Sequence, residues 1–247
     1  MLAPLLRLTL LLFLLYCGRA GAFAATPAPV LQKLAEFELP PLDPNYQLSS
    51  PVDGWYYGTS LRGGPINRGM FFRVNATGRF ESLSLRATAE FRATTPAPPV
   101  AGRDGAVYLI CGRSLYRFSE SVGLTQIADQ GSPELPGFFV SSPALATDGN
   151  VYGATNQVLY KVAAGGALSI VCTFAQLSDF VVAPIVMGSD GALYIVSRDG
   201  TTSRITTAGV QTVLGKFGSG AGEIGTSAPT GKMAVGSDGA LYAISSP

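Results

Sequence analysis

Short apolar segments recur along this chain, and each is bounded by Gly, Pro or Asp. Residues 144–146 and 184–187 are examples. Apolar runs of this length between turn residues are typical of β-strands and too short for ordinary helices. The 30 Gly and 17 Pro among 247 residues fit a chain with many tight turns. The pattern therefore predicts an all-β protein.

One pattern, Asp-Gly-x-x-Tyr, occurs five times at intervals of about 45 residues, the length of a β-propeller repeat. Its Asp residues are Asp53, Asp104, Asp148, Asp190 and Asp238. A Pro precedes each copy, at Pro51, Pro99, Pro143, Pro184 and Pro229. These positions indicate repeats that start near residues 51, 99, 143, 184 and 229.

Each repeat is predicted to hold up to four antiparallel strands. Pro begins the first strand, Asp-Gly forms a two-residue hairpin turn, and the Tyr-bearing segment is the second strand. A third strand contains one basic residue, and a Gly turn leads to the fourth. The basic residues are Arg73, Arg117, Lys161 and Arg204. Four strands in about 45 residues make one blade of a propeller.

The ends of the repeat region suggest how the array closes. Repeat five runs from Pro229 to Pro247, which is room for two strands only. Residues 30–37 match residues 210–217 at Val30, Leu34 and Phe37. We therefore expect a propeller-like domain of about five blades over residues 30–247, with the N-terminal strand completing the last blade and so covering open sheet edges. A shortened form of a longer array is the alternative.

The first 24 residues have the pattern of a secretory signal peptide. A basic start up to Arg7 precedes an apolar run over residues 8–17, and Ala22-Phe23-Ala24 is a small-x-small cleavage pattern. Cleavage near Ala24 would leave a short linker, residues 25–29, before the repeats. An uncleaved anchor and a lipidated Cys17 are the alternatives. The prediction is a secreted, periplasmic or cell-surface protein without a membrane span after cleavage.

Repeat one also carries a family pattern. It reads Trp55-Tyr56-Tyr57-Gly58-Thr59-Ser60, then Gly63-Gly64, then Gly69 to Val74, with Gly78 and Leu83 beyond. This resembles the GloVer-type tandem repeat of exported bacterial choice-of-anchor proteins. Repeats two to five keep the Asp-Gly-x-x-Tyr core and lack the Gly-Gly loop. The resemblance implies a propeller-like β array that is exported, and it implies no established activity.

Charge and composition exclude several kinds of chemistry. With 17 Lys and Arg against 16 Asp and Glu, the chain offers no basic surface for nucleic acid. The sequence has no His, so Ser-His-Asp and Cys-His nucleophiles and His-bearing metal sites are excluded. We predict no catalytic residue, cofactor or metal. Cys111 and Cys172 are interpreted as small apolar fillers of strands.

The most distinctive insertion is the glycine-rich loop over residues 62–69, close in sequence to the single Trp. Candidate ligand-binding residues are Trp55, Arg62, Asn67 and Arg68, and the expected partner is an extracellular glycan or protein. Core packing is the alternative role for Trp55. The repeated Asp residues are interpreted as turn residues rather than Ca²⁺ ligands. The repeated Tyr residues are interpreted as packing between blades, and the basic ones as solvated edge residues.

These observations favour an exported, non-catalytic binding or surface module. One alternative is an enzyme acting on extracellular polysaccharide. It would need two carboxylates roughly 5–9 Å apart at one mouth of the central channel. The other alternative is a degenerate repeat protein without an activity of its own.

Overall fold

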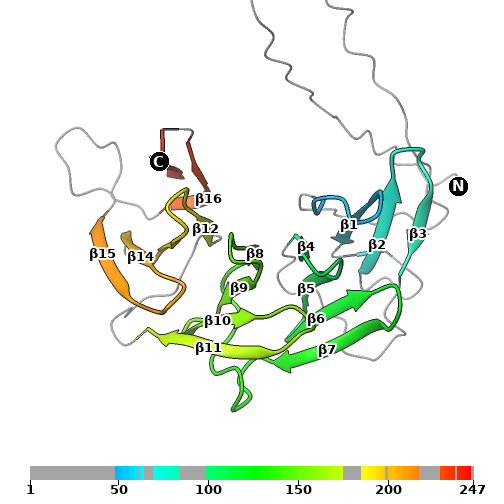
Figure 1. The fold of residues 1–247 in the computed structure, drawn as a ribbon, viewed down its shortest axis with the longest axis horizontal. Coiled ribbons are helices and arrows are strands. Elements are labelled where there is room, and N and C mark those ends of the chain that lie inside the picture. The colour runs from blue at the N-terminus through cyan, green and yellow to red at the C-terminus, as the bar shows by residue number, and fades with distance from the viewer. Residues whose placement is uncertain are drawn as a thin grey trace, which may run out of the picture.

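The computed structural model describes residues 48–60, 62–63, 69–83, 98–174, 185–197, 200–216, 229–236 and 238–245. Within these ranges every regular element is a β-strand, and all strand pairs are antiparallel (Figure 1). The all-β prediction is confirmed. No helix in the described part of the chain is long and apolar enough to cross a membrane.

The strands form five sheets that follow one another in chain order. The first sheet contains β1 (Trp55–Ser60), β2 (Met70–Asn75) and β3 (Phe80–Ser82). The second contains β4 (Val100–Ala101), β5 (Val107–Cys111), β6 (Ser114–Ser119) and β7 (Gly123–Asp129). The third contains β8 (Ala144–Leu145), β9 (Val151–Ala154), β10 (Val158–Val162) and β11 (Leu168–Thr173). The fourth contains β12 (Val186–Met187), β13 (Leu193–Val196), β14 (Thr201–Ile205) and β15 (Gln211–Lys216), and the fifth contains β16 (Pro229–Val235) and β17 (Leu241–Ser245).

Strand order within each four-stranded sheet equals chain order, so each sheet is a simple meander. The first strands contact one another from sheet to sheet, in the order β4, β8, β12 and β16. Figure 1 shows the sheets along an arc, with these strands toward the inside and β7, β11 and β15 toward the outside. The predicted four-stranded repeat is confirmed in repeats two to four, and the two-stranded fifth repeat is confirmed. Repeat one has three strands, and Val52 forms only an isolated bridge with Trp55. The segment predicted to close the array, residues 30–37, lies outside the described residues.

The Asp-Gly turns differ between repeat one and the rest. In repeat one, Val52 and Trp55 bond to each other across Asp53 and Gly54, whose φ angles are 49° and 79°. This is the predicted two-residue hairpin with both central residues left-handed. In repeat two the Gly102 N–H bonds to the Ala106 carbonyl, which leaves a three-residue loop. The same bonds recur in repeats three to five, so the two-residue prediction is wrong there.

The hydrophobic core lies between neighbouring sheets. Tyr108 and Leu115 of the second sheet pack with Val151 and Val162 of the third. A second cluster joins the third and fourth sheets, and a third joins the first and second. The repeat therefore buries its apolar side chains against its neighbours. The prediction that Tyr packs between blades is confirmed for Tyr57, Tyr108 and Tyr152, which are each at most 2% exposed. It fails in repeat five, where Tyr242 is 56% exposed, and Tyr194 of repeat four is half-buried.

Two glycines that directly follow a repeat Tyr make room for an aromatic ring. Gly153 on β9 faces Tyr160 on β10, and Gly58 on β1 faces Phe72 on β2. A Cβ at Gly153 would lie 2.1 Å from the Tyr160 hydroxyl, and one at Gly58 would lie 2.5 Å from Phe72 Cζ. The ring of the neighbouring strand thus covers the glycine backbone in both sheets. This pairing is a local reason for the Tyr-Gly pair in repeats one and three.

Tyr160 and Tyr152 form a matched pair for testing hydroxyl burial. The Tyr160 hydroxyl is fully buried and has no hydrogen-bond partner among the described residues. The Tyr152 hydroxyl donates to Asp148 Oδ2 at 2.7 Å. We expect Tyr160→Phe to keep or raise the free energy of unfolding by up to about 1 kcal/mol, and Tyr152→Phe to lower it by about 1 kcal/mol. Urea unfolding of both variants measures this, and equal losses would contradict it.

The two cysteines in the described part of the chain are both free thiols. Cys111 is buried on β5, where burial raises the pKa of its thiol above the usual range. Cys172 on β11 is half-buried and packs against the cluster between the third and fourth sheets. The interpretation of both as apolar fillers of strands is confirmed.

Candidate functional site

Each sheet presents two ends with different chemistry. The Asp-Gly end carries the turns between first and second strands and between third and fourth strands. The loop end carries the turns between second and third strands and the connections from one sheet to the next. A binding site at either end would be built from several neighbouring repeats.

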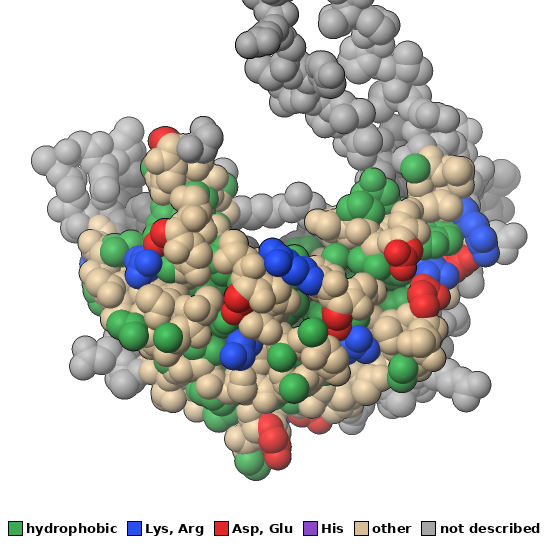
Figure 2. Space-filling view, in the orientation of Figure 1, with side chains coloured by type: hydrophobic (Ala, Val, Ile, Leu, Met, Phe, Trp, Pro, Cys, Tyr) green, Lys and Arg blue, Asp and Glu red, His purple; other side chains and the backbone are tan. Residues whose placement is uncertain are grey.

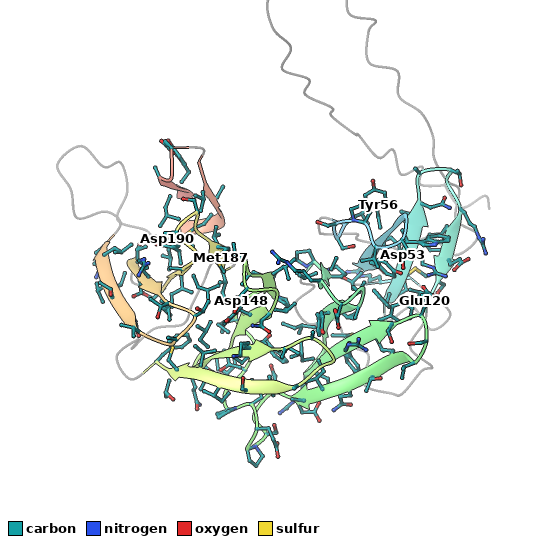
Figure 3. The ribbon with its side chains drawn as sticks, in the orientation of Figure 1. Asp53, Tyr56, Glu120, Asp148, Met187 and Asp190 are labelled. Atoms are coloured by element: carbon teal, nitrogen blue, oxygen red, sulfur yellow. The ribbon has the colours of Figure 1, made fainter. Side chains whose placement is uncertain are left out.

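At the Asp-Gly end, the repeat Asp and the repeat Tyr form a hydrogen-bonded pair. The Tyr hydroxyl donates to Asp Oδ2 in repeats two to five, at 2.9, 2.7, 3.0 and 2.9 Å. The other oxygen, Oδ1, accepts the backbone N–H two residues further on. Figure 3 labels Asp148 and Asp190, which hold this position in successive sheets. The interpretation of these Asp residues as turn residues is confirmed.

Basic side chains of the third strands join these pairs. Arg117 lies 2.9 Å from Asp104 Oδ2, and Arg204 lies 2.7 Å from Asp190 Oδ2. The prediction that these arginines are solvated edge residues is wrong, because the third strand places them beside the turn carboxylate. Figure 2 shows Lys and Arg side chains next to Asp and Glu along the arc.

In repeat one, the corresponding basic side chain pairs with glutamates instead of the Asp of the Asp-Gly turn. Arg73 pairs with Glu81 at 2.6 Å and with Glu120 of the next sheet. Its guanidinium carbon lies 4.3 Å from the centre of the Trp55 ring, and that of Arg79 lies 5.5 Å from it. Trp55 is therefore covered by cationic side chains of its own sheet.

Asp104 also links two sheets. Its Oδ2 accepts the Gly165 N–H of the third sheet at 3.1 Å, in addition to the bonds from Tyr108 and Arg117. Burial alone would raise its pKa, but these donors together lower the pKa of Asp104 below its ordinary value. At Asp190, the Arg204 guanidinium is the main cause of a lowered pKa. These carboxylates are therefore stabilised as anions.

The structure separates the predicted ligand-binding residues. Trp55 begins β1 at the Asp-Gly end, whereas Arg62 lies two residues after the last residue of β1, at the loop end. Asn67 and Arg68 lie outside the described residues. The described residues at the two ends of the glycine-rich loop, Gly63 and Gly69, are joined by a hydrogen bond of 3.2 Å at the loop end, where the turns at Gly112–Arg113 and Asn156–Gln157 also lie.

An open groove of about 680 Å³ lies at the loop end, between the second and third sheets. The connection from β7 to β8 forms one side of it. The side chains that line it include Arg113, Gln130, Pro133, Pro136, Phe138 and Gln157. Its volume falls in the usual range for small-ligand sites.

Hydrogen bonds fix the groove wall. The Gly131 N–H bonds to the Leu135 carbonyl at 2.8 Å, and the Leu135 side chain is fully buried below. The Thr155 hydroxyl donates to the Pro136 carbonyl at 2.7 Å. Asn156 accepts the Phe138 N–H through Oδ1 at 2.9 Å and donates its own N–H to the Phe138 carbonyl at 3.0 Å. The wall is therefore preorganised in this conformation.

Sequence reasoning missed this groove because no motif covers its residues. The available signal was the segment Gly131 to Gly137, which interrupts the repeat with two prolines between two glycines. Both glycines have positive φ angles, 78° and 83°. A side chain at Gly137 would also collide with Asn156 Oδ1 at 2.4 Å.

No group of three or more His, Cys, Asp or Glu that could hold a metal ion occurs among the described residues. No family model matches the sequence, and no curated protein matches it either. Solved structures do match. Virginiamycin B lyase from Staphylococcus aureus is 17% identical, with a TM-score of 0.59 over 79% of this chain and 61% of that one.

Two further structures show the same likeness. A streptogramin B lyase is 16% identical, with a TM-score of 0.60 over 83% of this chain and 63% of that one. The extracellular domain of a one-component system, BT4673 from B. thetaiotaomicron, is 11% identical, with a TM-score of 0.60 over 79% of this chain and 25% of that one. The chain spans about three-fifths of the length of the two lyases. Together with the radial meander sheets, this likeness defines an all-β, propeller-like repeat protein.

Proposed function

We propose that this chain is an exported binding module of the GloVer-repeat kind, and that it holds its ligand in the groove at the loop end. The preorganised groove wall carries this proposal, because a rigid site loses little conformational entropy when it binds. The groove also presents Phe138, which is 42% exposed although its backbone is fixed on both sides. Exposed aromatic side chains on rigid loops favour recognition.

The chemistry of the Asp-Gly end supports binding over catalysis. The carboxylates of Asp104, Asp148 and Asp190 each accept several hydrogen bonds, and their pKa values are lowered. A general acid at neutral pH needs a raised pKa instead. The sequence also lacks His, the most common general base.

A binding screen with a groove variant tests the proposal. We expect a panel of extracellular glycans and proteins to contain a ligand, and Phe138→Ala to weaken its binding at least about tenfold, as truncation of a central aromatic contact does. The matched control is Val122→Ala. Val122 is 70% exposed and lies in the turn at the Asp-Gly end, so its replacement should leave binding unchanged. Equal affinities of both variants for every ligand would contradict the proposal.

Export is tested separately. We expect the protein collected outside the cytoplasm to begin near residue 25, because the N-terminal segment has the pattern of a cleaved signal peptide. Intact-mass measurement reads the cleavage position. Replacing Leu12 by Arg in the apolar run should keep the full-length chain inside the cell. A product that retains residues 1–24 in the exported fraction would contradict cleavage.

A further inference from the structure

The groove at the loop end is lined by one basic side chain and several neutral ones. Of the described residues that line it, Arg113 alone is charged. Arg113 is exposed, and no salt bridge joins it to another described residue. By contrast, Arg73, Arg117 and Arg204 at the other end are all paired with carboxylates. Arg113 is therefore the basic group among the described lining residues that can pair with an anionic group.

The backbone around Arg113 belongs to the fixed groove wall. Its carbonyl accepts the Gln130 N–H at 2.8 Å, and Gly112 before it has a φ angle of 59°. A guanidinium binds a carboxylate through two parallel N–H bonds when its base is held in place. The position is thus suited to a planar carboxylate.

Two amide side chains and one aromatic side chain provide the other ligand contacts that the groove can offer. Gln130 Oε1 accepts the Phe139 N–H at 2.9 Å, which orients the Gln130 amide and leaves its NH₂ as a donor. Gln157 is exposed on the opposite side of the groove. Amide donors and acceptors suit hydroxyl groups, and an exposed aromatic face suits the C–H face of a sugar ring.

Apolar peptide side chains fit less well. The described lining contains Phe138 and two prolines. It contains no Leu, Ile, Val or Met, the side chains that would line a hydrophobic pocket. Grooves that bind peptides rely on such pockets to hold the apolar anchor side chains of the peptide. The lining therefore favours a ligand that is flat, rich in hydroxyls and anionic.

We propose that the groove binds an acidic oligosaccharide, with a uronic acid carboxylate on Arg113 and a sugar ring on Phe138. This inference rests on the proposed function, since it names the ligand class of the same groove. Arg113 is exposed, so added salt should weaken its ion pair with the ligand carboxylate and lower the affinity for the acidic oligosaccharide.

The test compares two probes that share one sugar backbone and differ at their carboxyl groups, which are ionised in the first and methylated in the second. These are α-1,4-linked trigalacturonate and its methyl ester, titrated calorimetrically into the mature chain. We expect the acid to bind at least about tenfold more tightly, the value of one charge-assisted contact. Arg113→Gln should reduce the acid to the affinity of the ester and leave the ester unchanged. Phe138→Ala should weaken both probes.

A control and two further probes make every outcome decisive. Arg103→Gln is the matched control, because Arg103 is exposed at the Asp-Gly end, and it should leave both affinities unchanged. Equal binding of acid and ester, with Phe138→Ala weakening both, overturns the acidic-sugar inference and keeps the proposed function. Preference for a sulfated trisaccharide or for an acidic proline-containing peptide overturns the inference in the same way. If neither Phe138→Ala nor Arg113→Gln changes the binding of any probe, both proposals are wrong.

Discussion

Gly153→Ala is expected to lower the free energy of unfolding by about 3 kcal/mol or more, a large value for overpacking. The added Cβ would lie 2.1 Å from the hydroxyl oxygen and 2.2 Å from Cζ of Tyr160. The Tyr160 ring is fully buried and packs edge-on against Phe139, so it cannot turn away without opening the core. Thermal and urea unfolding of the purified variant measure the loss.

Gly215→Ala is the matched control for this strand glycine. Gly215 lies on the exposed strand β15, and a Cβ there would meet nothing within 4 Å. We expect a change within about 0.5 kcal/mol. In a Tyr160→Ala background the Cβ at position 153 no longer meets the Tyr160 ring. Adding Gly153→Ala there should therefore lower the free energy of unfolding only slightly. A full loss in that background would show that the ring is not the cause.

Asp104→Asn is expected to lower the free energy of unfolding by about 2 kcal/mol, the value of lost hydrogen bonds to a charged group. Oδ1 accepts the Ala106 N–H, and Oδ2 accepts bonds from Tyr108, Arg117 and Gly165. An amide has one oxygen only, so one of these two sets of donors would face an NH₂ group. Hydrogen exchange should also show earlier loss of protection at the Gly165 amide.

The same carboxylates give the stability a defined dependence on pH. Their pKa values in the folded chain are lowered, whereas an unfolded Asp titrates near about 4. Their contribution is therefore complete above about pH 5 and is lost as the pH falls through 4 and below. Urea midpoints measured from pH 7 to pH 3 should fall, and Asp104→Asn should fall less steeply than the parent chain.

Asp53→Asn is the control for the stability experiment on Asp104. Asp53 occupies the two-residue turn with a φ angle of 49°, and Asn accepts this conformation as readily as Asp does. We expect unchanged stability at pH 7. A loss at Asp53 equal to that at Asp104 would mean that turn conformation, rather than the carboxylate network, sets the effect.

The sequence was sufficient to predict the strands and their order, because both follow from local pattern. The Asp-Gly-x-x-Tyr copies placed the hairpins, and the Tyr side chains of repeats one to three are buried between sheets as expected, whereas Tyr242 of repeat five is exposed. The length of the turn was not predictable from Asp-Gly alone. In repeats two to five the residue before Asp joins the loop, which depends on the carboxylate capping the backbone two residues on.

The candidate site was less accessible to sequence reasoning. Partners such as Arg117 and Asp104, or Asp104 and Gly165, come from different strands or sheets, so no spacing reveals them. The arginines therefore looked like solvated edge residues. The groove similarly depends on how the connection from β7 to β8 folds back onto Asn156 and Thr155. Trp55 and Arg62 are close in sequence, yet a six-residue strand separates the ends on which they lie.

Among the described residues, the first strands contact one another from one sheet to the next, from β4 to β8, β12 and β16. Such an array resembles a row of coupled units, in which an internal unit has two stabilising neighbours and a terminal unit has fewer. The second and third sheets each have neighbours on both sides and are also joined by the bond from the Gly165 N–H to Asp104, so they should be among the last described parts to exchange. The groove lies against those two sheets, so a ligand there would meet the most slowly opening part of the molecule.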